Sequence, residues 1–202
     1  MRRTPFLALA LAAVTSTAAA QQAPATAAAA PAGPNVGDMA PDFSLPAATR
    51  YGVLQAPLRL SDLRGQTVVV AFFPKARTSG CTVQLETYRD QYATMFNGGR
   101  KVVLVAVSAD ADTTLAGWAR QADFPFVLAS DKEGSAGMAY GAWMAQNRID
   151  NRYLFVVGPD GRIAYVARPF KAMAQDSYTD LAAAVDKLAP PPTSSADAHS
   201  SH

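Results

Sequence analysis

Residues 67–81 read TVVVAFFPKARTSGC, and this stretch decides the fold. Its first half, residues 67–73, is a continuous run of β-branched and aromatic side chains. Such a run is typical of a strand that is covered on both faces. At Pro74 the pattern changes to a short loop that leads to Cys81. We therefore expect a buried central strand whose loop opens into a helix.

Helix and strand patterns alternate beyond this stretch. Apolar side chains recur at helical spacing as far as Phe96, and the Asn-Gly-Gly sequence that follows ends the pattern. A second amphipathic helix is predicted around Trp118, and a short one over residues 133–140. Strand-like runs at residues 102–107 and 126–128 lie between the helices. The helical positions of the first pattern are Leu85, Tyr88, Tyr92, Met95 and Phe96.

The chain then predicts a β-hairpin and a last helix. Residues 153–157 and 162–166 flank a Gly-Pro-Asp-Gly sequence, which is a strong turn signal. Ser177 with Asp180 three residues later predicts the cap of the last helix. Strand–helix–strand units join parallel neighbours by right-handed crossovers, and the hairpin adds antiparallel strands at one side. The expected fold is α/β, a thioredoxin-like domain with a mixed central sheet and helices on both faces.

The two ends of the chain differ in composition from residues 36–189, which we take as the folded domain. Residues 1–20 combine two arginines, a short apolar run and three alanines, the pattern of a signal peptide cleaved after Ala20. The apolar run is too short for a membrane-spanning helix. Residues 21–35 predict an Ala/Pro-rich tether, and residues 190–202 a disordered tail.

This N-terminal pattern implies export, so we expect the protein to be periplasmic or secreted. Arg2 and Arg3 leave both the general secretory and the twin-arginine routes open. Without these two arginines the chain carries 16 basic and 16 acidic residues, and no basic stripe occurs. We therefore expect no nucleic-acid partner. No amphipathic or basic segment points to a membrane partner either, and the oligomeric state stays open.

The inventory of reactive side chains is small. Cys81 is the only cysteine, so the chain forms no internal disulfide and has no C-x-x-C dithiol. The two histidines, His199 and His202, lie in the tail, which argues against a His-dependent hydrolase or metal site. No glycine-rich phosphate loop occurs. We expect no metal and no cofactor, and the chemistry depends on Cys81.

Two interpretations of Cys81 compete. A lone cysteine is commonly a small buried hydrophobe. Cys81, however, follows a strand and lies at the start of a helix, where free N–H groups and the helix dipole favour a thiolate. An exported protein also gains little from an unpaired thiol that is neither used nor deeply buried. The position favours a nucleophile.

Residues 74–81 fit the spacing proline, three residues, threonine, two residues, cysteine, and so resemble the peroxiredoxin signature. Residues 36–46 and 124–131 resemble that family's opening strand segment and mid-domain strand, and Arg152 stands at the position of its active-site arginine. The resemblance is closest to the bacterioferritin-comigratory (Q-type) subgroup, in a one-cysteine form. It implies a thiol-dependent peroxidase that reduces hydrogen peroxide or organic hydroperoxides through a sulfenic acid at Cys81.

The same resemblance implies roles for four more residues. The Thr78 hydroxyl, the Cys81 backbone N–H and the Arg152 guanidinium would donate hydrogen bonds to the charge that develops along the O–O bond. Pro74 would shield the thiolate from water. Gln84, counted with the substrate-binding residues, would brace Arg152.

One departure from the subgroup has chemical consequences. A second, resolving cysteine often follows the first by five residues, and this chain has Glu86 there. An external thiol or protein reductant is then needed to close the catalytic cycle. The alternative is a thioredoxin-like redox-sensing or binding module that has no peroxidase turnover. Ser79 in place of a proline and Gly158 in place of an aspartate are smaller departures.

Overall fold

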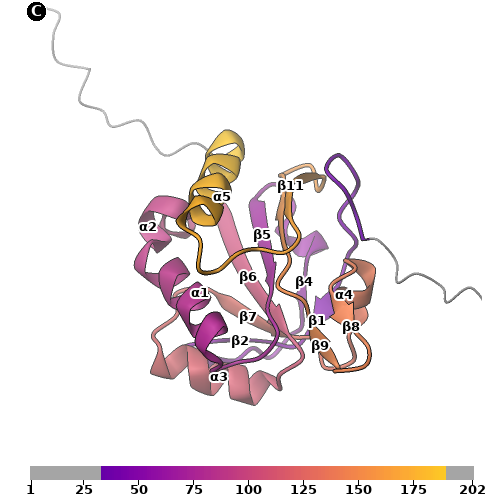
Figure 1. The fold of residues 1–202 in the computed structure, drawn as a ribbon, viewed down its shortest axis with the longest axis vertical. Helices are drawn as coiled ribbons and strands as arrows, with labels where there is room; N and C mark the ends of the chain where they lie inside the picture. The colour runs from indigo at the N-terminus through magenta and orange to yellow at the C-terminus, as the bar shows by residue number, and fades with distance from the viewer. Residues whose placement is uncertain (1–32, 190–202) are drawn as a thin grey trace, which may run out of the picture.

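The computed structural model describes residues 33–189, which form an α/β domain around a seven-stranded sheet (Figure 1). The sheet order is β11-β10-β5-β6-β7-β2-β3. Strands β5, β6 and β7 run parallel, whereas the pairs at both edges are antiparallel. The sheet strands are β2 (Ala47–Thr49), β3 (Gly52–Val53), β5 (Thr67–Phe72), β6 (Val102–Ser108), β7 (Val127–Ser130), β10 (Leu154–Val157) and β11 (Ile163–Ala167).

The remaining elements are helices and two small antiparallel pairs. The helices are α1 (Ser79–Asp90), α2 (Tyr92–Met95), α3 (Asp112–Gln121), α4 (Ser135–Ala139) and α5 (Gln175–Leu188), with 3-10 turns η1 (Ser61–Leu63) and η2 (Asn97–Gly99). The small pairs are β1 (Ser44–Leu45) with β4 (Leu58–Arg59), and β8 (Trp143–Met144) with β9 (Ile149–Asp150). The predicted signal peptide, most of the predicted tether and the predicted tail lie outside the described residues.

Every residue of β5 is buried, as the unbroken apolar run predicts. Val69 and Ala71 face a core formed with α1, α2, α3 and α5. Val68 and Val70 face a second core, which the N-terminal segment and α4 cover. Figure 1 shows α1 and α2 on one side of the sheet and α4 on the other. The predicted mixed sheet between helices is confirmed, and it brings the end of β5 to the start of α1.

Two local predictions are wrong. The helix expected to continue through Phe96 ends at Asp90, and α2 continues its apolar face after a break at Gln91. Ser177 does not cap α5, because the turn at residues 171–174 starts the helix at Gln175 and Ala174 is the N-cap residue. The predicted opening strand segment at residues 36–46 contains the short strand β1 and one isolated bridge, from Met39 to Arg162. The β2–β3 and β8–β9 pairs were not predicted.

Asp150 is a buried carboxyl with no hydrogen-bond partner among the described residues. It lies on β9 opposite Trp143, and its Oδ1 occupies the space where a side chain at Gly137 would begin. The carboxylate of Asp131 is close, and it accepts hydrogen bonds from Ser135 Oγ at 3.0 Å and from the Gly137 N–H at 2.7 Å. Burial, and secondly the charge of Asp131, raise the pKa of Asp150 to about 8.

This raised pKa makes the stability pH-dependent. The unfolded chain loses the Asp150 proton near pH 3.8 and the folded chain near pH 8. In that window the folded state binds more protons, so this group lowers the free energy of unfolding as the pH rises. Relative to wild type, Asp150→Asn is therefore expected to stabilise by at least about 2 kcal/mol more at pH 9 than at pH 4. Urea unfolding at both pH values measures this.

The matched control is Asp186→Asn, because Asp186 is exposed on α5. Its effect on the free energy of unfolding is expected to be the same at both pH values. Equal effects of Asp150→Asn at pH 4 and pH 9 would contradict the argument from burial.

Candidate active site

Cys81 is the third residue of α1 and its side chain is fully buried. Thr78 is the N-cap residue, and the first helical hydrogen bond runs from the Thr82 N–H to the Thr78 carbonyl at 2.8 Å. The N–H of Cys81 has no acceptor among the described residues. This end of a helix carries partial positive charge and favours an anion. The sulfur therefore lies at the positive end of the helix, next to a backbone N–H that is free to donate to an incoming oxygen.

Arg152 comes from the segment before β10 and reaches the sulfur of Cys81. Its Nη2 lies 3.3 Å from Cys81 Sγ. The antiparallel pairing of β10 with β5 makes this possible, since it aligns the start of β10 with the end of β5. The Nη1 of the same guanidinium donates to Gln84 Oε1 and, at 3.4 Å, to the Gly80 carbonyl. Residues 71 positions apart thus form one charged site.

Gln84 is held at both ends of its side-chain amide. It is fully buried, its Oε1 accepts from Arg152, and its Nε2 donates to the Tyr88 hydroxyl at 2.9 Å. Arginine can only donate, so the amide oxygen must face Arg152 and the amide nitrogen must face Tyr88. Burial raises the pKa of Tyr88 well above its ordinary value, so its hydroxyl remains neutral. In this arrangement Gln84 contacts Arg152 and offers no open face to a substrate.

Three residues of this network lie on one face of α1. Gln84 and Tyr88 follow Cys81 by three and seven residues, and this spacing places Cys81, Gln84 and Tyr88 on the same side of the helix. The sequence predicts Tyr88 only as a position on the helix and indicates no hydrogen bond for it. The spacing between Gln84 and Tyr88 is the signal that could have indicated the hydrogen bond.

The loop between β5 and α1 contains the other predicted residues. Pro74 directly follows the buried Phe73 and is half-buried. The Thr78 hydroxyl donates to the Lys75 carbonyl at 2.9 Å. Its proton is therefore engaged, and what it offers a substrate in this arrangement is a lone pair rather than the predicted donor. Arg77 adopts a left-handed backbone conformation with φ 64°, which turns the chain into the helix.

Asp110, which the sequence did not single out, holds this loop in place. It follows β6, and its Oδ2 accepts the Ala76 N–H at 2.7 Å and the Ser108 hydroxyl at 3.0 Å. Its carbonyl accepts the Ser130 hydroxyl at 2.7 Å. Because Ala76 lies midway between Pro74 and Thr78, this carboxylate positions the residues that approach the sulfur.

Asp110→Ala is expected to slow peroxide-dependent oxidation of Cys81 about tenfold, the equivalent of about 1.4 kcal/mol. The reason is that the Ala76 N–H loses its acceptor and the loop loses its link to β6. Stopped-flow measurement of the second-order rate constant tests this. Asp62→Ala is the control, because Asp62 is exposed in η1, and it is expected to leave the rate constant unchanged. An unchanged rate in Asp110→Ala would contradict the positioning role.

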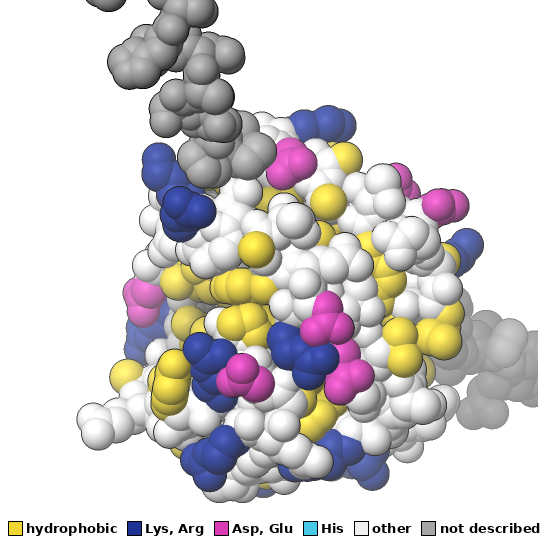
Figure 2. Space-filling model, turned by 90° about the vertical axis from the view of Figure 1, so that its left-hand side faces the viewer, with side chains coloured by type: hydrophobic (Ala, Val, Ile, Leu, Met, Phe, Trp, Pro, Cys, Tyr) yellow, Lys and Arg dark blue, Asp and Glu magenta, His cyan; other side chains and the backbone are white. Residues whose placement is uncertain are grey.

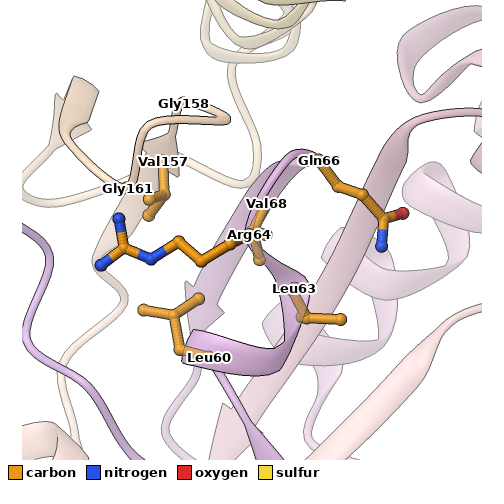
Figure 3. Close-up of a pocket in the computed structure, with 8 residues that line it drawn as sticks. All are labelled: Leu60, Leu63, Arg64, Gln66, Val68, Val157, Gly158 and Gly161. Atoms are coloured by element: carbon orange, nitrogen blue, oxygen red, sulfur yellow. The ribbon is translucent and has the colours of Figure 1, made fainter.

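A small cavity elsewhere in the domain does not belong to this site. It lies at the N-terminal end of β5, between η1 and the β10–β11 turn (Figure 3). Its volume is about 10 Å³, roughly the space of one water molecule. Arg64 crosses it and donates to the Asp160 carbonyl, and a side chain at Gly161 would collide with the guanidinium. The cavity lies at the opposite end of β5 from Cys81, and the Arg64 side chain that crosses it makes a structural contact.

Residues 33–189 contain no cluster of three or more His, Cys, Asp and Glu side chains that could hold a metal ion. Within the same range, no helix has the length and apolar character to cross a membrane. On the face drawn in Figure 2, basic and acidic side chains lie interspersed between apolar ones.

Comparison with known proteins identifies clear relatives. The AhpC/TSA family profile matches residues 36–166. Peroxiredoxin Bcp of Escherichia coli K12 is 33% identical over 141 residues, which are 67% of this chain and 86% of that protein. Alkyl hydroperoxide reductase E of Mycobacterium bovis is 35% identical over 156 residues, or 75% of this chain and 97% of that protein.

The chain is also similar to solved structures. The crystal structure of peroxidoxin BcpB from Mycobacterium tuberculosis superposes with a TM-score of 0.65 at 28% identity, covering 77% of this chain and 98% of that one. Peroxiredoxin Q from Xanthomonas campestris superposes with a TM-score of 0.60 at 22% identity, over 70% and 89% of the two chains. The second likeness shows the fold alone.

Proposed function

The chain belongs to the AhpC/TSA family, and we propose that it is a thiol-dependent peroxidase whose nucleophile is Cys81. It reduces hydrogen peroxide or organic hydroperoxides. The observation that carries this proposal is the 3.3 Å contact between Arg152 Nη2 and Cys81 Sγ at the first turn of α1. A guanidinium beside a sulfur at a helix N-terminus favours the thiolate as nucleophile and favours negative charge on a nearby oxygen.

The first half of the reaction oxidises Cys81. The thiolate attacks the nearer oxygen of the peroxide, so that an S–O bond forms as the O–O bond breaks. The sulfur becomes a sulfenic acid, and the leaving oxygen takes a proton and departs as water or alcohol. The Arg152 guanidinium and the free Cys81 N–H are the donors for the charge on these oxygens. Thr78 and Pro74 border the approach.

The second half of the reaction needs a reductant from outside the chain. Cys81 is the only cysteine in the sequence, and Glu86 occupies the position where the related subgroup often has a resolving cysteine. Thiol attack on the sulfenic acid forms a mixed disulfide and releases water, and a second thiol then regenerates Cys81. An external thiol or protein reductant therefore completes each turnover.

Two measurements test this function. Equimolar hydrogen peroxide is expected to convert Cys81 to a sulfenic acid, which mass spectrometry detects after trapping. Adding a thiol with excess peroxide is expected to give multiple turnovers per protein. A redox-sensing module would form the oxidised cysteine without turnover, and that result would contradict a peroxidase.

We also propose that the protein works outside the cytoplasm. The support is the pattern of residues 1–20, two arginines followed by an apolar run and a small-residue cleavage site after Ala20. Expression of the full chain followed by cell fractionation and N-terminal sequencing tests the proposal. An intact N-terminus on cytoplasmic protein would contradict it.

A further inference from the structure

A groove of about 230 Å³ borders the loop that carries Pro74 and Thr78. We call it the cationic groove, and its walls are Pro74 and Lys75 after β5, Asp110 after β6, and Arg148 and Ile149 of the β8–β9 hairpin. It thus lies at the carboxyl ends of two parallel strands. Ligands of α/β sheets commonly bind at this edge. The groove shares Pro74 with the candidate active site.

The groove carries more positive than negative charge, because two of its three charged side chains are cations. Lys75 and Arg148 are exposed, and among residues 33–189 neither side chain has an ion-pair or hydrogen-bond partner. Asp110 brings one negative charge, and its carboxylate accepts hydrogen bonds from the Ala76 N–H and the Ser108 hydroxyl, so the groove keeps a net positive charge. Pro74 and Ile149 add apolar surface. Two free cations beside a small apolar wall suit a small organic anion such as a carboxylate.

The two halves of the proposed reaction use the site differently. Arg152, at 3.3 Å from Cys81 Sγ, already faces the charge that develops during peroxide reduction. For the reductive half, the chain supplies no thiol that could attack the oxidised sulfur, because it contains no second cysteine. Its nucleophile is an external thiolate, which is itself an anion. An open groove with two unpaired cations beside the active-site loop could bind such an anionic reductant.

We propose that the cationic groove binds the carboxylate of a small anionic thiol that reduces the sulfenic acid of Cys81. This inference rests on the proposed function, since it concerns the second half of the same cycle. With the carboxylate at Lys75 and Arg148, the thiolate sulfur attacks Cys81 Sγ, which is fully buried in this structure and must become accessible for this step. An S–S bond forms, the S–O bond breaks, and the oxygen leaves as hydroxide that is protonated to water. A second thiol attacks the sulfur of the bound reductant and releases the Cys81 thiolate and a disulfide of the reductant.

The test compares thiols of different charge on the full-length protein. Cys81 is first oxidised with one equivalent of hydrogen peroxide, and the rate of sulfenic acid loss is then measured with 3-mercaptopropionate, with neutral 2-mercaptoethanol and with cationic cysteamine. The variant is the double substitution Lys75→Gln/Arg148→Gln. The control is Lys101→Gln/Lys187→Gln, which removes two exposed cations at the start of β6 and on α5.

In the groove variant, the rate with 3-mercaptopropionate relative to 2-mercaptoethanol is expected to fall about fivefold or more, and the relative rate with cysteamine to rise. The ratio cancels differences in intrinsic reactivity between thiols and general effects on Cys81. The control is expected to keep the wild-type ratios, and 0.5 M salt is expected to reduce the wild-type preference. Unchanged ratios in the groove variant would overturn the proposal.

Two further outcomes are distinguishable. If the variant instead loses rate only in the first half, with a carboxylate-bearing hydroperoxide compared with neutral cumene hydroperoxide, the groove serves the peroxide and the thiol proposal is wrong. If hydrogen peroxide does not oxidise Cys81 in the wild-type protein, the proposed function fails and this inference fails with it.

Discussion

Cys81→Ser is expected to lower peroxide turnover by on the order of 10⁴-fold or more, to the level of the uncatalysed reaction. A serine hydroxyl is hardly ionised at neutral pH and does not form a stable oxidised state with peroxide. No other thiol in the chain can replace the lost one. The measurement is peroxide consumption in the presence of a thiol reductant, alongside mass spectrometry for any oxidised protein.

The fold of this variant needs its own check, because Cys81 is fully buried among apolar side chains. Serine is close in volume, so circular dichroism and a cooperative thermal transition are expected to remain. Met173, which is 79% exposed, supplies a control for oxidation that is unrelated to the site. Peroxide turnover by well-folded Cys81→Ser above about 1% of wild type would assign the chemistry to another group.

The part of the site that the sequence predicted lies mostly in one continuous stretch. Pro74, Thr78 and Cys81 are close in sequence, and the strand before them has an unambiguous pattern. Residues this close in sequence are also close in space after folding, so a local pattern is enough to predict that they lie together. Arg152 could be placed only through a family resemblance, because its approach to Cys81 depends on the pairing of β10 with β5.

Asp110 shows what local patterns leave out. Its partner Ala76 lies 34 residues away, and the hydrogen bond exists because β5 and β6 are parallel neighbours. The strands β2, β3, β8 and β9 are two or three residues long, too short for an alternating pattern to be recognised. At Ser177 the capping pattern was present, but a preceding turn started the helix earlier. The Asp110 contact thus depends on tertiary structure, whereas the start of α5 depends on a local turn.

Arg152→Met is expected to lower the second-order rate constant for Cys81 oxidation by about 10²- to 10³-fold, or about 3–4 kcal/mol. The substitution keeps an apolar stem of similar length and removes both the Nη2 contact to Sγ and the Nη1 contact to Gln84. Arg152→Lys is expected to recover only part of the rate. A lysine has one ammonium group and cannot hold the sulfur and Gln84 with two separate donors in a fixed plane.

The arrangement of Gln84 makes this prediction sharper. If Gln84 acts by orienting the guanidinium, Gln84→Leu alone is expected to cost about tenfold, and to cost almost nothing further when Arg152 is already methionine. Stopped-flow rates of the two single variants and the double variant give this coupling. Arg59→Met, at an exposed residue of β4, controls for the loss of one positive charge. Additive losses would mean that Gln84 supports the site independently of Arg152, through its hydrogen bond to Tyr88 or its packing in α1.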